Sequence, residues 1–381
     1  MFLVLLDLSA AFDTVDHGII GNRLPSYFGI TDSALNWFIS YLSNRTQTVF
    51  VRGTQSSERQ LKYGVPQGSV LGPELFKDYT TPLSKVIQAH GVKYHFYADD
   101  TQMYISFKPG INESSAKIKL ESCIESVRTW MASNYLKLND DKSEFVIFGS
   151  PHNLAKVTTS TVKIGSHHIT SSKVVRNIGA MFDCRLKMDS QISSMSKSAW
   201  YHLYQISKIR HHLTTEQSKC AIHACVTSRL DQNNSLLAGI PSNLLVKLQR
   251  IQNAAAKVIS GGKKRDHVTP ILKELHWLPV HERIIFKTVL LVFKTLNGRG
   301  PAYLQDIVHV YQPARSLRSS STLLLSVPKT KFASYGDCSF SSFAPKMWNS
   351  LPLKIRSCVT VSSFKTSLKT YLFKQAYNLT S

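Results

Sequence analysis

The chain has 381 residues, of which 43% are hydrophobic, so it is long enough for two or three domains with cores of their own. No apolar run approaches the length of a membrane span, and the short apolar run at the N-terminus contains Asp7, which argues against a signal peptide. Six cysteines without any Cys-x-x-Cys spacing favour a reducing intracellular compartment. Composition therefore argues against secreted, disulfide-rich proteins and against membrane-spanning proteins.

The charge is large and unevenly distributed. The formal net charge is +22, from 46 basic and 24 acidic residues. Residues 1–183 carry 18 basic and 16 acidic residues, whereas residues 184–381 carry 28 basic and 8 acidic residues, a net charge of +20. A cationic segment of this kind attracts polyanions by releasing their counterions. It indicates a nucleic-acid partner, the alternative being a basic surface without any partner.

Hydrophobic periodicity predicts the elements in chain order. A short strand comes first, and helices alternate with strands up to residue 183, which predicts an α+β layer of helices on one side of a small antiparallel sheet. A more helical region follows. The predicted elements are a strand at 2–6, a helix at 24–42, a strand at 47–51, a helix at 75–91, a hairpin at 94–107, a helix at 115–136, a strand at 144–148, and helices at 189–213, 216–228, 245–259 and 283–296.

The adjacent acids Asp99 and Asp100 lie at the turn of the predicted hairpin. Two neighbouring carboxylates repel each other, so a protein that fixes them in place commonly offsets the repulsion with a cation. Asp7, at the end of the first predicted strand, supplies a third carboxylate. Three hard oxygen ligands suit Mg²⁺ and two-metal phosphoryl transfer, whereas an isolated Asp-Asp pair is more typical of a solvated turn.

The order of several motifs distinguishes these two interpretations. A loop rich in glycine and proline, Gly64-Val-Pro-Gln-Gly-Ser-Val-Leu-Gly-Pro73, lies between the first strand and the hairpin Tyr97-Ala-Asp-Asp100. With these motifs the chain resembles the reverse transcriptases of LINE-type (non-LTR, jockey-like) retrotransposons. The segments that match the five motifs of this family are residues 5–17, 64–73, 97–100, 130–144 and 175–183.

The resemblance implies an architecture and a set of partners. It implies a polymerase palm over residues 1–183, a helical thumb-like region over 184–262 and a basic C-terminal extension over 263–381. In this family a fingers region precedes the first motif, so we expect the chain to encode palm chemistry but not a complete polymerase. The implied partners are an RNA template, a DNA primer, a dNTP and two Mg²⁺ ions, with Mn²⁺ as an alternative, and we expect no membrane partner and a nuclear or cytoplasmic location.

The resemblance also implies residue roles. Asp7, Asp99 and Asp100, with the backbone oxygen of Leu8, would hold the metals, and Lys142 would neutralise or protonate the leaving pyrophosphate. Phe12 would exclude a ribose 2′-hydroxyl, the alternative being an ordinary core phenylalanine. Gln67 and Gly68 would contact the nucleotide and the templating base. The residues expected to contact nucleic acid are Arg250, Lys257, Lys263, Lys264 and Arg265, although the last three could form a simple linker.

The predicted function is therefore RNA-directed DNA synthesis by two-metal transfer of a nucleotide from dNTP to a primer 3′-hydroxyl. The alternative is a catalytically inactive relic or a non-catalytic nucleic-acid-binding protein. Two segments, residues 230–235 and 336–341, depart from the family pattern and favour that alternative. An RNA-directed RNA polymerase is disfavoured by Phe12 and by Tyr97-Ala98 before the acids.

Overall fold

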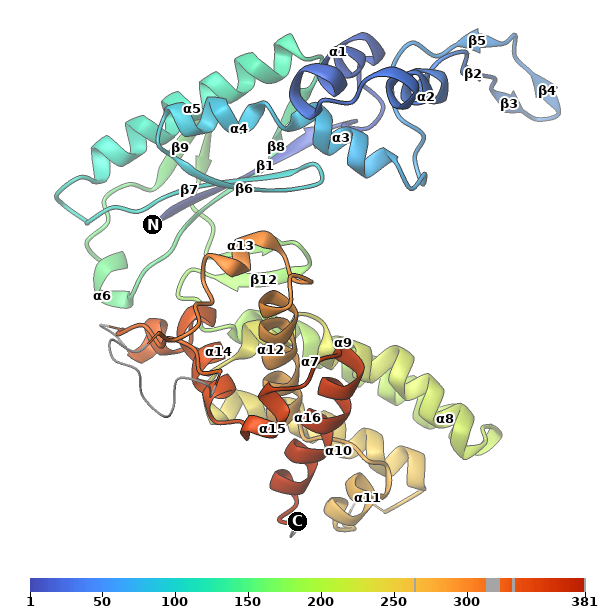
Figure 1. Ribbon diagram of the computed structural model, residues 1–381, viewed down its shortest axis with the longest axis vertical. Coiled ribbons are helices and arrows are strands. Elements are labelled where there is room, and N and C mark those ends of the chain that lie inside the picture. The colour runs from blue at the N-terminus through green and yellow to red at the C-terminus, as the bar shows by residue number, and fades with distance from the viewer. Residues whose placement is uncertain (264, 313–322, 331–332, 380–381) are drawn as a thin grey trace. The chain divides into compact units, whose positions relative to one another are not determined.

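The computed structural model describes residues 1–263, 265–312, 323–330 and 333–379 (Figure 1). The chain divides into two compact units, Met1–Leu186 and Lys187–Ser381. Helices and strands together confirm the predicted α+β class. Within the described residues no helix is both long enough and apolar enough to cross a membrane.

The N-terminal unit is built on a four-stranded antiparallel sheet of strand order β6-β7-β1-β8. Helices α4 and α5 lie along one face of this sheet (Figure 1). The strands of the unit are β1 (Phe2–Ser9), β2 (Thr46–Gln47), β3 (Phe50–Val51), β4 (Thr54–Gln55), β5 (Arg59–Gln60), β6 (Lys93–Tyr97), β7 (Asp100–Ile105), β8 (Lys137–Ile147), β9 (Thr161–Ile164), β10 (His167–Thr170), β11 (Val174–Asn177) and β12 (Ala180–Asp183). The helices are α1 (His17–Phe28), α2 (Asp32–Leu42), α3 (Gly72–Thr80), α4 (Leu83–Ala89), α5 (Glu113–Ser133) and α6 (Pro151–Leu154).

The two faces of β1 have different surroundings because successive side chains of a strand point to opposite sides. The even-numbered residues Phe2, Val4, Leu6 and Leu8 belong to the large core cluster beneath the helices. Leu3 and Leu5 lie on the other face, in a smaller cluster that includes Val175 of the β11–β12 hairpin. Asp7 continues this odd-numbered series, so the alternation places its carboxylate on the face opposite the helices.

Four predictions of element boundaries in this unit are wrong, each for a local reason. The predicted helix over residues 24–42 is two helices, because Gly29 ends α1 in the left-handed conformation (φ 65°). The predicted helix over 75–91 is interrupted at Pro82, and the predicted strand over 47–51 is two short strands with different partners. The strand predicted at 144–148 begins earlier, at Lys137, because a bulge in β8 interrupts its pairing with β1 and hides the alternation.

The C-terminal unit is helical in its described residues. One cluster of buried side chains joins α12, α14, α15 and α16, with Trp348, Phe293 and Phe364 at its centre. The predicted helices at 189–213, 245–259 and 283–296 are present, while the one at 216–228 continues as a π-helical turn over His223–Thr227. The helices are α7 (Asp189–Ile209), α8 (Thr215–Ile222), α9 (Ser228–Asp231), α10 (Ser242–Ser260), α11 (Val268–Glu274), α12 (Val280–Leu296), α13 (Ala302–Gln305), α14 (Phe340–Asn349), α15 (Leu353–Arg356) and α16 (Val361–Ala376).

Candidate active site and nucleic-acid interface

The two adjacent acids lie at a tight hairpin between β6 and β7. Tyr97 pairs with Asp100, which leaves Ala98 and Asp99 as the two residues of the turn. Ala98 has a positive φ of 52°, which is uncommon for a residue with a side chain and is typical of such turns. Asp99 is therefore held in the turn, while Asp100 begins β7. The sequence prediction of a hairpin with both acids at its tip agrees with this geometry.

The pairing of β7 with β1 brings Asp100 and Asp7 together. The antiparallel register pairs Leu6 with Thr101. Asp7 and Asp100 are the next residues along the two strands, so they come together at the end of this ladder. Both carboxylates line one cavity of about 120 Å³, whereas Asp99 does not line it. The other residues that the cavity exposes include Lys142, Glu144, Gln102, Arg176, Asn177 and Ile178.

The acids at this site are poorly neutralised by the protein. Burial raises the pKa of Asp100, and the neighbouring carboxylates Asp99 and Asp7 raise it further. The cation closest to Asp7 is the Nζ of Lys142, 3.9 Å from Oδ2, on a side chain that is 72% exposed. An ion pair of this length on an exposed lysine contributes little. The carboxylates therefore retain an excess of negative charge, which is the environment that a hard divalent cation neutralises.

The fit of this site to metal ions rests on its donor chemistry. In the part of the chain that the structure describes, no three His, Cys, Asp or Glu side chains stand in an arrangement that could hold a metal ion. Asp7 and Asp100 nevertheless converge on one cavity with hard oxygen donors and an unfavourable charge. Leu8, whose backbone oxygen was predicted as a ligand, has its side chain in the core and does not line the cavity.

The bulge in β8 accounts for the position of Lys142. β1 pairs through Leu5 with Glu144 and through Asp7 with Asn139, so the residues between Asn139 and Glu144 form the bulge. Bulges redirect side chains and are frequent beside active sites. Here the bulge carries Lys142 to the edge of the cavity, next to Asp7.

The predicted nucleotide-contacting residues lie on a second segment that is joined to the first motif. The ring of Phe12 is half-buried and lies 4.9 Å from the ring of Phe76. The N–H of Val65 donates to the carbonyl of Phe12 at 2.9 Å, and the amide of Gln67 donates to Oδ1 of Asp13 at 2.9 Å. The structure thus brings Phe12 close to the loop of Gln67 and Gly68, although none of these three residues lines the carboxylate cavity.

Gly68 has a φ of 80°, and a Cβ at this position would meet no atom within 4 Å. The positive φ therefore favours glycine at position 68, and the space beside its Cα is open. Gln67 and Gly68 are both exposed. A ligand can reach them from solvent.

Sequence reasoning missed four polar residues around the carboxylate cavity. Gln102 and Asn177 exchange two hydrogen bonds between their side-chain amides, at 2.8 and 3.0 Å, which joins the β6–β7 hairpin to the β11–β12 hairpin. Burial raises the pKa of Glu144, while the backbone N–H of Arg176 partly offsets this. The sequence did contain a signal for Gln102. Side chains two residues apart on a strand point to the same face, so Gln102 lies on the same face of β7 as Asp100.

Comparison with known proteins shows which family the N-terminal unit resembles. Residues 1–182 match the family described as reverse transcriptase (RNA-dependent DNA polymerase). This stretch belongs to the reverse transcriptase family. The predicted resemblance to jockey-like, non-LTR reverse transcriptases is confirmed by the relatives that follow.

Two curated relatives from Drosophila melanogaster cover different shares of the chain. The "Probable RNA-directed DNA polymerase from transposon BS" is 24% identical over 294 residues, which are 74% of this chain and 31% of the relative. The RNA-directed DNA polymerase from mobile element jockey is 26% identical over 204 residues, 51% of this chain and 21% of the relative. The chain thus spans less than a third of the length of these relatives. Among solved structures, apo telomerase from Candida tropicalis matches with a TM-score of 0.38 and 13% identity, over 74% of this chain and 46% of that one.

Outside the reverse transcriptase domain, the C-terminal unit has an open groove of about 630 Å³ between α7 and α10. The predicted contact residues Arg250 and Lys257 both line it. They are seven residues apart on α10, which places them on one face of the helix. Arg210 also lines the groove, but its guanidinium donates to the carbonyls of Val258 and Ile259 at 2.8 Å, so it has a structural role at the end of α10.

The remaining predicted contacts do not line this groove. Lys263 and Arg265 are exposed beside the end of α10, and Lys264 lies outside the described residues. Sequence reasoning missed the exposed side chains of Trp200 and Tyr204 on α7. The Nζ of Lys208 lies 4.4 Å from the ring centroid of Tyr204. Aromatic and basic side chains interleaved on an exposed helix are typical of surfaces that bind single-stranded nucleic acid.

Proposed function

We propose that this chain carries the palm and thumb of an RNA-directed DNA polymerase, and that it extends a DNA primer on an RNA template with dNTP. The observation that carries this proposal is the convergence of Asp7 and Asp100 on one cavity in a unit of the reverse transcriptase family. In the proposed division, residues 1–183 form the palm, 184–262 the thumb-like region and 263–381 the C-terminal extension.

The carboxylates of Asp7, Asp99 and Asp100, with the backbone oxygen of Leu8, would hold two Mg²⁺ ions. When bound, these ions supply charge stabilisation to the attacking and leaving oxygens of phosphoryl transfer. Asp99 lies in the turn directly before Asp100, and its carboxylate raises the pKa of Asp100. The two-residue turn at Ala98 fixes the backbone from which these side chains act.

The other residues of the domain would position the substrates. Phe12 would present the exposed part of its ring to the sugar and exclude a ribose 2′-hydroxyl, while Phe76 supports the ring from the core side. Gln67 and Gly68 would contact the nucleotide and the templating base. Lys142, carried by the bulge, would place a positive charge and a proton beside the leaving pyrophosphate.

Nucleic acid would bind the C-terminal unit through phosphate contacts from Arg250, Lys257, Lys263, Lys264 and Arg265. Residues 184–381 carry a net charge of +20, and the groove beside α10 is open. We propose accordingly that the chain acts inside the cell, in the nucleus or cytoplasm, where its template would be found. Charge reversal at the three residues 263–265 should weaken the binding of all sequences alike, because phosphate contacts carry no base information.

A primer-extension assay tests the catalytic proposal. The wild-type chain joined to a fingers region, with an RNA template, a DNA primer and dNTP in Mg²⁺, should give extended primer, and Asp7→Asn should abolish it. Asp141→Asn is the matched control, because this exposed aspartate lies on β8 with the cavity residues Lys142 and Glu144 but does not itself line the cavity. Extension by Asp7→Asn at the wild-type rate would remove the carboxylate from the mechanism.

A second candidate function is nucleic-acid binding without catalysis, and the concentration of charge in residues 184–381 favours it. The same assay separates the two functions. A wild-type chain that binds the template–primer duplex but does not extend the primer would support the second function.

A further inference from the structure

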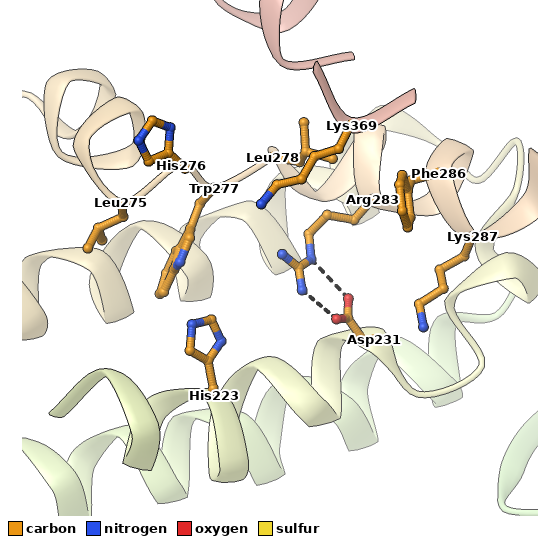
Figure 2. A pocket seen from close by; sticks show the side chains of 10 residues that line it. All are labelled: His223, Asp231, Leu275, His276, Trp277, Leu278, Arg283, Phe286, Lys287 and Lys369. Atoms are coloured by element: carbon orange, nitrogen blue, oxygen red, sulfur yellow. Dashed lines mark hydrogen bonds and ion pairs between the residues drawn. The ribbon is translucent and has the colours of Figure 1, made fainter. Parts of the chain in front are cut away.

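The C-terminal unit has a second cavity, separate from the groove beside α10. Its volume is about 260 Å³, and its walls come from segments far apart in sequence (Figure 2). His223 belongs to the π-helical turn, Asp231 ends α9, Arg283 and Lys287 belong to α12, and Lys369 belongs to α16. This arrangement is absent from the motifs that identify the reverse transcriptase domain.

The cavity has an excess of positive charge. Its lining has three permanent cations, Arg283, Lys287 and Lys369, and one carboxylate, Asp231, so its formal charge is +2. Figure 2 shows the ammonium of Lys369 reaching from α16 toward the same space as the guanidinium of Arg283. Neither Lys287 nor Lys369 has a carboxylate within ion-pair distance in the described part of the chain. The two lysines are therefore available to an anionic ligand.

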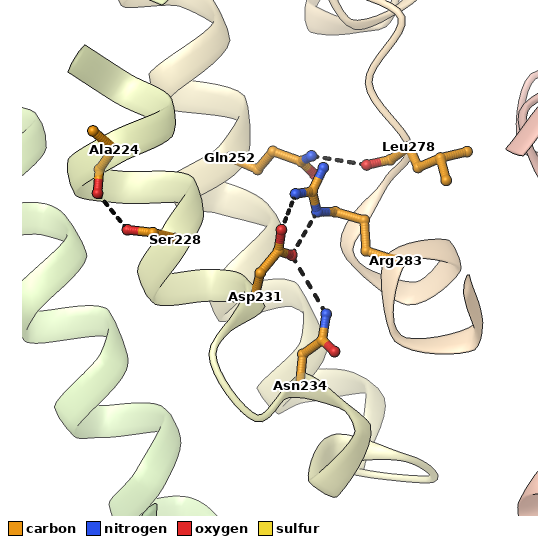
Figure 3. A network of polar contacts seen from close by, with 7 residues as sticks. All are labelled: Ala224, Ser228, Asp231, Asn234, Gln252, Leu278 and Arg283. Atoms are coloured by element: carbon orange, nitrogen blue, oxygen red, sulfur yellow. Dashed lines mark hydrogen bonds and ion pairs between the residues drawn. The ribbon is translucent and has the colours of Figure 1, made fainter. Parts of the chain in front are cut away.

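Arg283 is held in place by its partner. Its Nε donates to Oδ1 of Asp231 at 2.9 Å, and its Nη2 donates to Oδ2, which makes a bidentate pair (Figure 3). Such a pair fixes the plane of the guanidinium. The third nitrogen, Nη1, makes no hydrogen bond to any described residue, so its two N–H groups remain available to a ligand.

The wall beside Arg283 is also fixed by hydrogen bonds. The amide of Gln252 donates to the carbonyl of Leu278 at 2.8 Å (Figure 3), and the hydroxyl of Tyr377 donates to the carbonyl of Trp277 at 2.7 Å. His223 lies 5.4 Å from Trp277 between ring centroids and points into the cavity (Figure 2). Its position on a π-helical turn is of a kind that is frequent at functional sites.

We propose that this cavity binds the terminal phosphomonoester of a nucleic-acid strand. A phosphomonoester has a charge close to −2 at neutral pH and three acceptor oxygens, which match the +2 lining and its converging donors. Arg283, Lys287 and Lys369 supply the charge, and the His223 ring can supply one further N–H. The cavity is below the usual size range of small-molecule sites, roughly 300–1,000 Å³, so it suits one phosphate group with its sugar.

This inference rests on the proposed nucleic-acid binding, because that proposal identifies the phosphate as the end of a nucleic-acid strand. Burial lowers the pKa of His223 and the charge of Arg283 lowers it further, while Asp231 raises it and Lys369 lowers it, so both cations lie near this ring. An internal phosphodiester carries one charge and continues on both sides, so it matches the +2 lining and the limited volume less well. A strand end satisfies both conditions.

The test compares single-stranded oligonucleotides that differ only in a 5′-phosphate or a 5′-hydroxyl. Binding to the full chain is measured by fluorescence anisotropy with the label at the 3′ end. We expect the 5′-phosphorylated strand to bind about tenfold more tightly. Lys369→Gln and Lys287→Gln should each reduce this difference to about twofold or less, while the 5′-hydroxyl strand loses no more affinity than it does with the control.

The control variant is Lys374→Gln, which removes the same charge from an exposed position on α16 but does not line the cavity. An equal loss of the phosphate preference in Lys374→Gln would overturn the proposal. Equal binding of the two strands by the wild-type chain would overturn the cavity assignment and leave nucleic-acid binding by the groove intact. Failure of both strands to bind would overturn the proposed nucleic-acid binding as well.

Two further probes identify the source of the phosphate. Inorganic phosphate should remove only the extra affinity that the 5′-phosphate gives to the strand, and it should do so only at a much higher concentration than the oligonucleotide. If inorganic phosphate alone binds as tightly as the phosphorylated strand, the cavity takes free phosphate and the strand-end assignment is wrong. Tighter binding of a phosphoserine peptide than of the phosphorylated strand would likewise overturn it.

Discussion

Replacing Asp100 by asparagine should separate the stability of the reverse transcriptase domain from its activity. In the folded chain the pKa of Asp100 is raised by burial and by the carboxylates of Asp99 and Asp7. The folded state therefore binds a proton at this position more readily than the unfolded state does. Stability is consequently lost as the pH rises through the range between the ordinary and raised pKa values, and it is regained on acidification.

The size of this effect follows from the position of the side chain. Like charges on neighbouring strands destabilise a sheet by about 0.2–1 kcal/mol, and Asp100 is exposed enough for solvent to screen the repulsion. Asp100→Asn should therefore stabilise the domain by at most about 1 kcal/mol. For a domain of this length such a change raises Tm by roughly 2–4 °C.

The same substitution should abolish primer extension, with a decrease of at least about 100-fold, because an interaction that stabilises developing charge is lost. A third readout is independent of activity. A bound cation stabilises the folded state, by about 2.7 kcal/mol when its concentration is a hundredfold above Kd. Mg²⁺ should accordingly raise the Tm of the wild-type chain and have a much smaller effect on Asp100→Asn.

Thermal unfolding of the wild-type chain and of Asp100→Asn from pH 4 to pH 8, with and without Mg²⁺, measures both the pH dependence of stability and the effect of Mg²⁺ on Tm. Asp141→Asn is the control, and its stability should stay within about 0.5 kcal/mol of wild type at each pH. A destabilised Asp100→Asn variant, or one that responds to Mg²⁺ as the wild type does, would refute the reasoning that uncompensated carboxylates form a cation site.

Three further predictions concern other parts of the molecule. Phe12→Ala should relax discrimination against ribonucleotides in primer extension. Because packing against the core is lost, it should also lower the free energy of unfolding in urea by about 2–3 kcal/mol. Unchanged discrimination would make Phe12 only a core residue. Gln102→Ala should lower the free energy of unfolding by about 1–2 kcal/mol because it leaves the amide of Asn177 unpaired. A double-mutant cycle with Asn177→Ala should show coupling between the two side chains. Additive losses would contradict the paired arrangement. Affinity for an RNA–DNA duplex should fall by orders of magnitude between about 50 and 200 mM salt, and Arg250→Gln combined with Lys257→Gln should reduce the steepness of this dependence; binding that does not respond to salt would exclude phosphate contacts.

The sequence was sufficient to find the hairpin and its acids because the relevant signals are local. A strand period of two, an Asp-Asp pair at the turn and an ordered series of motifs all lie within short segments. The α+β class followed for the same reason. Boundaries were less predictable, since Gly29 and Pro82 divided two helices that hydrophobic periodicity alone would continue.

The surroundings of the acids depended on contacts between segments far apart in the chain. Gln102 and Asn177 are 75 residues apart and meet only because the β11–β12 hairpin lies against the sheet. The bulge that carries Lys142 to Asp7 is defined by the register of β8 against β1, and a polar run in sequence does not reveal a register.

The sequence by itself determined the chemical character of this protein: three carboxylates in reverse transcriptase motifs, followed by a strongly cationic segment. It could not determine which charges are already paired. Asp231 and Arg283 are 52 residues apart, and their pairing leaves Lys287 and Lys369 without a carboxylate partner in the cavity that all four residues line. The tertiary structure decided this, because ion pairing depends on distances of a few ångströms between side chains that only the packing of α9, α12 and α16 brings together.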